Sequence, residues 1–422
     1  MTPGIDEEIP HVLELLVGLL GVAVVVAILV RPLRLPYTVA LVIAGLLAGL
    51  LARLAGYPPV DVSPELVLLV LLPGLVFEAA YRLRLTEIRR WFGGLLLLAI
   101  PGVVISAAVV AVVLSVATGL RLDLAFIVGA MVSATDPAAV IATFKRLTVP
   151  RALSTMVDGE SLLNDGTGLV LFAIAVSAVY APVSPLGAVT SFIGIVSVSV
   201  LIGLATGFAA AWVFRFIADD HLIELTLTVV LAYGSYVLAD QVGLSGVIAT
   251  VTAGIVLGNV GINRDRADDA ADAIDTVWEF IAYLLTAFVF LLVGLAIPPV
   301  RLLDSVVPIA WGILAILLGR AFVVYVLLGG SSRLAVRPGL ADRIPGSWLH
   351  VLFWSGLRGA VAVAMALSLP LDIPERPLLQ EITFGIILFT LLIQGTTIGW
   401  VVDHTVRADS ADLPDQPAPV GG

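Results

Sequence analysis

Long apolar runs alternate with short polar breaks along nearly the whole chain. Most of these runs are close to 20 residues long, which is about the length that a helix needs to cross the hydrocarbon core of a bilayer. Proline, glycine or charged residues separate them, as at Arg31–Pro32 and Pro298–Pro299. The pattern predicts an all-α polytopic membrane protein with thirteen spans, at about 11–30, 36–55, 64–81, 94–118, 124–145, 160–180, 187–216, 222–240, 243–258, 275–297, 305–329, 348–369 and 379–402.

Composition supports a membrane protein and excludes some chemistry. Of the 422 residues, 60% are hydrophobic and 13% are charged, whereas soluble domains have roughly 25% charged residues. The chain has no cysteine, which excludes disulfides, thiolate zinc sites and iron–sulfur clusters. The acidic start at 6–8 differs from the basic start of a signal peptide, so we expect no cleavage. For 259–274 we expect a solvated loop, and for 403–422 a short disordered tail.

Basic residues indicate how the chain lies in the membrane. When the thirteen spans divide the loops into two alternate sets, sixteen of the 22 Lys and Arg residues fall in one set and four in the other. Cytoplasmic loops carry the excess of positive charge. We therefore expect the N-terminus outside and the C-terminus in the cytoplasm. The two remaining basic residues, Arg320 and Arg358, fall inside predicted spans.

The sequence Thr135-Asp136-Pro137 lies in the middle of the fifth predicted span. Asp is favoured at a helix N-cap and Pro at the first helical position after it, which predicts a span broken near Ala134 and a second half-helix that starts at Pro137. Broken backbone at membrane depth is tolerated where it lines a cavity or is buried in protein, and it recurs in the ion sites of transporters. The alternative is a proline kink with a stray aspartate at a helix end.

A second polar block, Gly159–Gly166, opens the sixth predicted span. On a helix, Ser161 and Asp165 share one face, while Glu160 and Asn164 share the adjacent face. Carboxylate, hydroxyl and carbonyl oxygens suit a hard cation, and at most two free carboxylates suit a monovalent ion that must bind and leave. A buried carboxylate can hold a proton instead, so cation and proton would compete for one group. The alternative is a capping arrangement at the start of the span.

The arginines inside spans need a partner, because a charged side chain in hydrocarbon costs roughly 2.5–3.5 kcal/mol on insertion scales. For Arg320 we expect an ion pair with Glu160. Arg358 lies in a second glycine-interrupted span, within Gly356–Ala360. The interrupted spans, the fifth and the twelfth, fall in opposite halves of the chain, as two inverted-topology repeats would place them. Snorkelling of Arg358 to an interface is the alternative. For Glu78 we favour a structural role near the cytoplasmic rim over a role as an ion ligand.

These blocks, together with Leu72–Ala80, resemble the monovalent cation:proton antiporters of the sodium/proton exchanger family over about residues 11–402. The adjacent Asn164 and Asp165 resemble the electroneutral branch, since the electrogenic branch has two adjacent aspartates. The resemblance implies a homodimer in which a core moves against a dimer domain. The expected parts are 1–93 and 218–300 for the dimer domain, 94–182 and 301–402 for the core, 183–217 for a linker helix and 403–422 for the tail.

The resemblance also implies a role for each candidate site residue. The expected Na⁺ and proton site consists of Asp136, Asp165, Ser161 and the main-chain carbonyl of Thr135. Asn164 and Pro137 would orient this site, and Glu160 would pair with Arg320. Arg358 and Glu78 are secondary candidates.

We therefore expect a multi-pass transporter of the plasma membrane that exchanges one Na⁺ for one H⁺ by alternating access and serves pH homeostasis. We expect no cofactor and no nucleic-acid partner. A K⁺/H⁺ or broad monovalent cation antiporter is the main alternative, followed by a passive cation channel and by a membrane scaffold or sensor. An enzyme is not expected, because neither Gly-x-Ser-x-Gly nor His-Glu-x-x-His occurs in the sequence.

Overall fold

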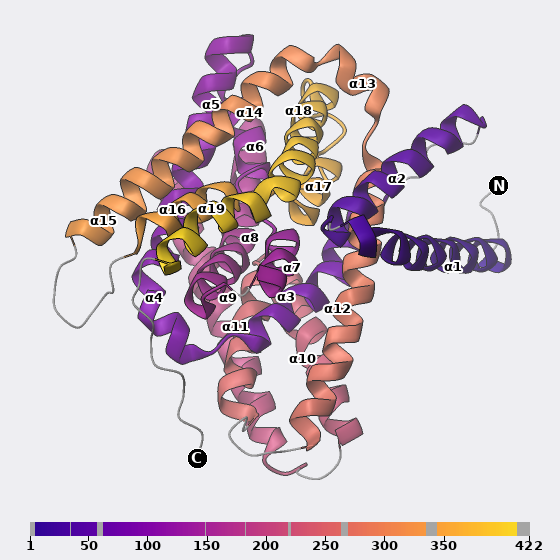
Figure 1. Ribbon diagram of the computed structural model, residues 1–422, viewed down its shortest axis with the longest axis vertical. Coiled ribbons are helices and arrows are strands. Elements are labelled where there is room, and N and C mark those ends of the chain that lie inside the picture. The colour runs from indigo at the N-terminus through magenta and orange to yellow at the C-terminus, as the bar shows by residue number, and fades with distance from the viewer. Residues whose placement is uncertain are drawn as a thin grey trace.

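The computed structural model describes residues 5–33, 35–56, 62–147, 149–181, 183–217, 221–262, 269–334 and 344–411. Within these ranges the chain forms helices joined by short turns, and no described residue forms a strand (Figure 1). The expected all-α class is confirmed.

The helices occur in the following order along the chain. In the first half of the chain they are α1 (Ile5–Val30), η1 (Arg31–Leu33), α2 (Tyr37–Leu54), η2 (Leu66–Leu71), α3 (Leu72–Arg82), α4 (Leu85–Leu97), η3 (Leu98–Gly102), α5 (Val103–Thr118), α6 (Leu122–Met131), α7 (Ala138–Leu147), α8 (Arg151–Tyr180) and α9 (Pro185–Phe214). In the second half they are α10 (His221–Asp240), α11 (Gly246–Val256), η4 (Leu257–Gly261), α12 (Asp269–Ala296), α13 (Pro299–Asp304), α14 (Val306–Ala321), η5 (Phe322–Leu328), α15 (Gly329–Leu334), α16 (Gly346–Trp354), α17 (Ala360–Leu367), α18 (Arg376–Phe389), η6 (Thr390–Gln394) and α19 (Gly395–Ala411).

The lengths of the helices agree with a protein that crosses a membrane many times. Eight helices in the described ranges are long and apolar enough to do so, namely Tyr37–Leu54, Leu85–Thr118, Arg151–Tyr180, Pro185–Phe214, His221–Asp240, Asp272–Ala296, Val306–Ser332 and Arg376–Val406. Shorter apolar helices lie at Val17–Val30, Leu122–Met131 and Gly246–Gly261. The multi-pass architecture is confirmed, whereas the exact number of thirteen spans is not.

The start of α8 differs from the prediction. The helix begins at Arg151, so Glu160 lies in its interior and not at the start of a span. The residues before Glu160 are polar enough to resemble a loop, but Leu153, Met156 and Val157 are buried at helical spacing. This amphipathic first part extends the helix, and it removes the capping alternative for the polar block.

Two segments expected to be irregular are partly helical or lie outside the described residues. α19 continues to Ala411, so the first part of the expected disordered tail is helix, and residues 412–422 are not described. In the expected loop at 259–274, residues 263–268 are not described, and α12 begins at Asp269.

Two groups of helix contacts can be distinguished, and smaller contacts join them, such as those of α8 with α3 and α11 and of α2 with α7. In one group α2 packs against α12, and α3 packs against α10 and α11; in the other, α5 packs against α6 and α14, and α14 packs against α18. α9 contacts α10 and α11 of the first group and α8 of the second. The backbones of α2 and α12 approach closely at Gly45 and Gly294, where a Cβ on either glycine would overlap main-chain atoms of the other helix.

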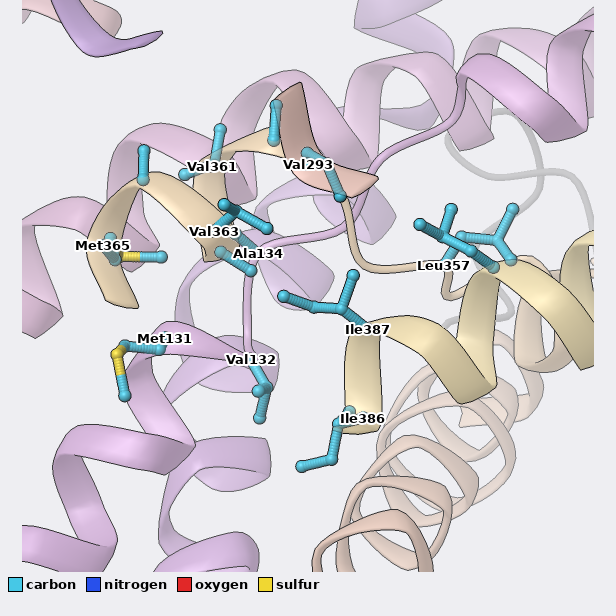
Figure 2. Packing of buried hydrophobic residues seen from close by; sticks show 14 of the residues in the cluster. Met131, Val132, Ala134, Val293, Leu357, Val361, Val363, Met365, Ile386 and Ile387 are labelled. Carbon is cyan, nitrogen blue, oxygen red and sulfur yellow. The ribbon is translucent and has the colours of Figure 1, made fainter. Parts of the chain in front are cut away.

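The short half-helices α7 and α17 lie near the centre of the view in Figure 1. Figure 2 shows Met131, Val132 and Ala134 in the same buried cluster as Val363 and Ile387. Because lipid tails are as apolar as these side chains, close packing rather than exclusion of water holds helices together in a membrane. This packing fixes the ends of the half-helices relative to each other.

Candidate ion-binding site

The first interruption, residues 132–137, separates α6 from α7. The Asp136 carboxylate accepts a hydrogen bond from the Ala138 amide at 2.9 Å. The Ile141 amide donates to the Pro137 carbonyl at 2.8 Å, which continues the first turn of α7. Asp136 therefore caps this half-helix and Pro137 follows it, as the preferences of both residues require.

The second interruption, residues 355–359, separates α16 from α17. The Leu357 amide donates to the Ser355 carbonyl at 2.8 Å, and the Arg358 amide donates to the Thr390 hydroxyl at 3.1 Å. These bonds satisfy backbone groups that an unbroken helix would have satisfied internally, which is necessary at membrane depth.

The two interruptions cross at Asp136. Its amide donates to the Leu357 carbonyl at 2.8 Å, and its carboxylate also accepts from the Ala360 amide at the start of α17. The crossing is close because Gly359 has no side chain, and a Cβ there would overlap the Asp136 carboxylate. The N-termini of two half-helices therefore point at one carboxylate, and both their free amides and their dipoles stabilise negative charge.

Helix α8 holds the first interruption through Thr135. The Asn164 Oδ1 atom accepts from the Thr135 amide at 3.0 Å, and its Nδ2 donates to the Thr135 hydroxyl at 2.7 Å. The Ser161 hydroxyl donates to the Thr135 carbonyl. Asn164 is 1% exposed, so its amide is committed to this structural contact.

A cavity of about 380 Å³ lies beside the crossing. The predicted site residues that line it are Thr135, Asp136, Pro137, Ser161 and Asp165. Both aspartates are partly exposed to this cavity. The structure thus brings together two carboxylates, a hydroxyl and a main-chain carbonyl, whereas the Glu160 and Asn164 side chains lie on the other side of α8 and do not line it.

Several charged residues of the cavity were missed by the sequence reasoning. These residues are Asp158, Lys145, Glu279 and Arg82. Arg82 forms an ion pair at 2.6 Å with Glu78, the secondary candidate from the sequence, which also lines the cavity. Asp158 lies seven residues before Asp165, two turns along the same face of α8, and an earlier start of the predicted span would have revealed it. The others come from α3, α7 and α12, and their meeting is a tertiary property.

Glu160 and Arg320 form a buried ion pair. The Arg320 Nη2 atom lies 3.0 Å from Glu160 Oε2, and Nη1 contacts Oε1. The same guanidinium donates to the Leu352 carbonyl from Nη2 at 2.6 Å and from Nε at 3.2 Å. Arg320 therefore satisfies a carbonyl near the C-terminal end of α16 and connects α8, α14 and α16, away from the cavity.

Arg358 lies behind the second interruption. Its side chain is 2% exposed, so it does not reach an interface as a snorkelling arginine would. Its Nη1 donates to the Gly356 carbonyl at 3.0 Å, and its Nε has no hydrogen-bond partner in the described part of the chain. It lies within electrostatic range of Asp165 and Glu160, so its positive charge balances acids around the site.

The sequence and the fold both resemble known proteins. The family model "Sodium/hydrogen exchanger, transmembrane" matches residues 20–404. The Na⁺/H⁺ antiporter ApNhaP of Aphanothece halophytica is 38% identical over 355 residues, which cover 82% of this chain and 65% of that protein. The low-affinity Na⁺/H⁺ antiporter NhaS1 of a Synechocystis strain is 37% identical over 375 residues, which cover 84% of this chain and 68% of that protein. The chain thus spans about two thirds of the length of these relatives.

A solved structure has the same fold. The structure of the sodium proton antiporter MjNhaP1 from Methanocaldococcus jannaschii at pH 8 superposes with a TM-score of 0.73 and covers 94% of this chain and 99% of that one. The two sequences are 18% identical, so this comparison concerns the arrangement of helices alone.

Proposed function

This chain belongs to the family of transmembrane sodium/hydrogen exchangers, and we propose that it exchanges Na⁺ for H⁺ across a membrane. The proposal depends on one observation, the meeting of two carboxylates, a hydroxyl and a carbonyl beside one cavity. Oxygen atoms of these kinds suit a hard cation. The proposed Na⁺ ligands are Asp136, Asp165, the Ser161 hydroxyl and the Thr135 carbonyl.

The hydrogen bonds around the two aspartates give them different roles in the proposed exchange. The Asp136 carboxylate accepts from two backbone amides, those of Ala138 and Ala360, and such donors favour the ionised form. Asp165 accepts no hydrogen bond within the described residues. We therefore assign the exchanging proton to Asp165. A proton on Asp165 removes half of the negative charge that binds Na⁺, so the two substrates exclude each other.

Exchange of one Na⁺ for one H⁺ moves no net charge. The neutral Asn164 supports this stoichiometry, because both ends of its amide are bound to Thr135 and it offers no further titrating group. A membrane potential acts with roughly 2.3 kcal/mol per net charge per 100 mV. For an electroneutral exchanger this term vanishes, and only the two ion gradients drive transport.

The two groups of helix contacts support alternating access. We assign 94–182 and 301–402 to a moving core, 1–93 and 218–300 to a dimer domain, and 183–217, which contains α9, to the linker between them. The cavity lies between α7, α8 and α17 of the core and α2, α3 and α12 of the dimer domain. Its lining includes Arg82 and Lys145. Both fall in the set of predicted loops that holds sixteen of the Lys and Arg residues, so we propose that the cavity opens to the cytoplasm.

The setting of the protein is part of the same proposal. We propose a homodimer in the plasma membrane with the N-terminus outside, which contributes to pH homeostasis. Exposed apolar side chains on α1, including Val24, Ile28 and Leu29, support contact of this helix with lipid or with a second subunit.

Dye-monitored proton flux in proteoliposomes tests the proposed function. Na⁺, Li⁺ and K⁺ are added separately to vesicles with an imposed pH gradient. We expect Na⁺ to dissipate the pH gradient. The rate should not change when the membrane potential is clamped to different values. The apparent affinity for Na⁺ should fall as the pH is lowered, because protons occupy the same group.

The matched variants are Asp165→Ala, which removes the exchanging carboxylate, and Asp123→Ala, which removes an acid at the start of α6 that pairs with Arg121 at 2.5 Å outside the cavity. The first should lose exchange while eluting as a folded protein, and the second should keep it. Exchange in Asp165→Ala would refute the site. A response to K⁺ alone would indicate a K⁺/H⁺ antiporter, and cation flux without proton movement would indicate a channel.

A further inference from the structure

A second cavity, of about 290 Å³, lies where α3 ends and where α4 and α8 begin. The residues that line it are Arg82, Arg84, Glu87, Arg151, Ser154 and Thr155. Three arginines and one glutamate leave it with an excess of positive charge, and two hydroxyl groups complete its polar wall. This cavity is separate from the ion site, but Arg82 lines both.

The wall of this cavity is held in place by neighbouring side chains. Asn259 accepts from the Leu85 amide at 2.7 Å and donates to the Leu83 carbonyl at 2.8 Å, which fixes the turn that carries Arg84. The Thr155 hydroxyl donates to the Glu87 carboxylate at 2.6 Å. The site is thus preorganised, and a ligand would not have to order the turn when it binds.

Two of the arginines are available to a ligand. Arg84 and Arg151 are exposed, and within the described residues neither forms an ion pair or a side-chain hydrogen bond. Arg151 is the first residue of α8, a helix of 30 residues whose N-cap, Pro150, supplies no side-chain cap. The positive end of this helix therefore adds to the charge of the arginines.

We propose that this cavity binds a phosphate-type oxyanion, either free phosphate or the phosphate of an anionic lipid headgroup. A guanidinium presents paired donors in a plane that match the oxygens of phosphate. The Ser154 hydroxyl can donate to a remaining oxygen, whereas the Thr155 hydroxyl already donates to Glu87. The bias of basic residues toward the cytoplasm explains why arginines occur here. It does not explain why three of them converge on one cavity, while Arg89 of α4, the helix that contributes Glu87 to the cavity, is exposed and lies outside it.

An anion in this cavity would act on transport through Arg82. The Arg82 Nε atom lies 2.6 Å from Glu78 Oε1, and its Nη2 donates to the Asp275 carbonyl at 3.2 Å. A bound oxyanion competes with Glu78 for the same guanidinium and leaves the Glu78 charge free to attract cations into the first cavity. This regulatory consequence rests on the proposed function, whereas anion binding itself does not.

Binding is tested on the purified full chain in detergent. Inorganic phosphate is titrated against chloride at constant ionic strength, and the midpoint of thermal unfolding is recorded. We expect phosphate to raise the midpoint of the wild type. In the double variant Arg84→Gln/Arg151→Gln the apparent affinity should fall about tenfold or more for each charge-assisted hydrogen bond that the substitutions remove. The matched control is Arg89→Gln/Arg146→Gln, which removes two exposed arginines outside the cavity.

The source of the anion is tested in proteoliposomes made of phosphatidylcholine alone or with phosphatidylglycerol, with and without internal phosphate. An effect of phosphate in neutral lipid assigns the site to the free ion, and an effect of phosphatidylglycerol alone assigns it to a headgroup. Either should lower the half-saturating Na⁺ concentration about fivefold or more, and the Arg84→Gln/Arg151→Gln variant should lose this shift.

Absence of both effects in the wild type overturns the proposal, and so does an equal loss of the effects in the control variant and in Arg84→Gln/Arg151→Gln. Phosphate binding without any Na⁺/H⁺ exchange would refute the proposed function and leave this site standing.

Discussion

The two interrupted segments cross at Asp136, but different chemistry holds each of them. The first is held by neutral groups, because Asn164 and Ser161 bind the backbone and hydroxyl of Thr135. The second begins after α16, where the charged Arg320 binds the Leu352 carbonyl, and it continues to an amide bound by the Thr390 hydroxyl. One segment therefore presents a carboxylate to the cavity, while the other presents amides and a glycine.

Both interruptions are held from one short stretch of α8, the first by Asn164, which we call the neutral anchor, and the second by the Glu160–Arg320 ion pair, the charged anchor. Glu160 and Asn164 are four residues apart on one face; Asn164 binds the first interruption directly, and Glu160 binds the second through Arg320. Ser161 and Asp165 occupy the neighbouring face and line the cavity. Ser161 both holds the first interruption and is a proposed ligand. Glu160 and Asn164 only hold the site, and Asp165 only faces the cavity, so variants of these two kinds should fail in different ways.

The charged anchor should have the largest effect on stability. Arg320→Ala leaves Glu160 buried and unpaired, and breaking such a pair costs about 3–5 kcal/mol. We expect a corresponding fall in the free energy of unfolding in detergent, measured by thermal or chemical denaturation. Arg89→Ala, at an exposed position, is the control. An unchanged stability of Arg320→Ala would show that the charged anchor does not hold the second interruption.

Gly359→Ala places a methyl group in the crossing itself. The added Cβ would overlap the Asp136 carboxylate, so the two interruptions must move apart. We expect a loss of up to about 3 kcal/mol in the free energy of unfolding and, because the amide of Ala360 moves away from Asp136, loss of exchange in the proton-flux assay.

A glycine in open space provides the control for this variant. Gly194 on α9 has no atom within 4 Å of an added Cβ, and alanine is the better helix former. Gly194→Ala should therefore keep both stability and exchange. If Gly359→Ala behaved in the same way, the close crossing would not be needed for transport.

Asn164→Ala tests the neutral anchor. The substitution leaves the Thr135 amide and hydroxyl without their partner, and unmade hydrogen bonds of buried groups cost about 1–3 kcal/mol. We expect a loss of about 2 kcal/mol in stability, smaller than that of the charged anchor. Because the Thr135 carbonyl is a proposed ligand, exchange should also weaken, with a raised half-saturating Na⁺ concentration. Loss of stability with unchanged Na⁺ dependence would separate Asn164 from the ion site.

Much of this architecture is accessible from the sequence. Apolar runs of span length predict the helices, and the Asp136-Pro137 pair predicts a break because both residues prefer the start of a helix. The spacing of four residues places Ser161 and Asp165 on a common face of α8, whatever the exact start of that helix.

The sequence alone does not predict which residues of the two interruptions contact each other. Nothing local predicts that the Asp136 amide meets the Leu357 carbonyl or that Asn164 binds the amide of Thr135, because these contacts depend on how distant helices pack. The start of α8 was misplaced for a related reason, since its polar first part becomes helical by burying one face. Asp158 and the second cavity were missed with it.

The smallest effect is expected from Thr390→Val, which removes one hydroxyl from the second interruption without changing its volume. The Arg358 amide loses its acceptor at 3.1 Å, and a single neutral hydrogen bond contributes about 1 kcal/mol. The charged anchor remains, so we expect thermal stability to fall slightly and the half-saturating Na⁺ concentration to stay near that of the wild type. If this variant instead lost exchange as Gly359→Ala should, the second interruption would depend on its hydroxyl anchor and not on Arg320, and the contrast between the two segments would disappear.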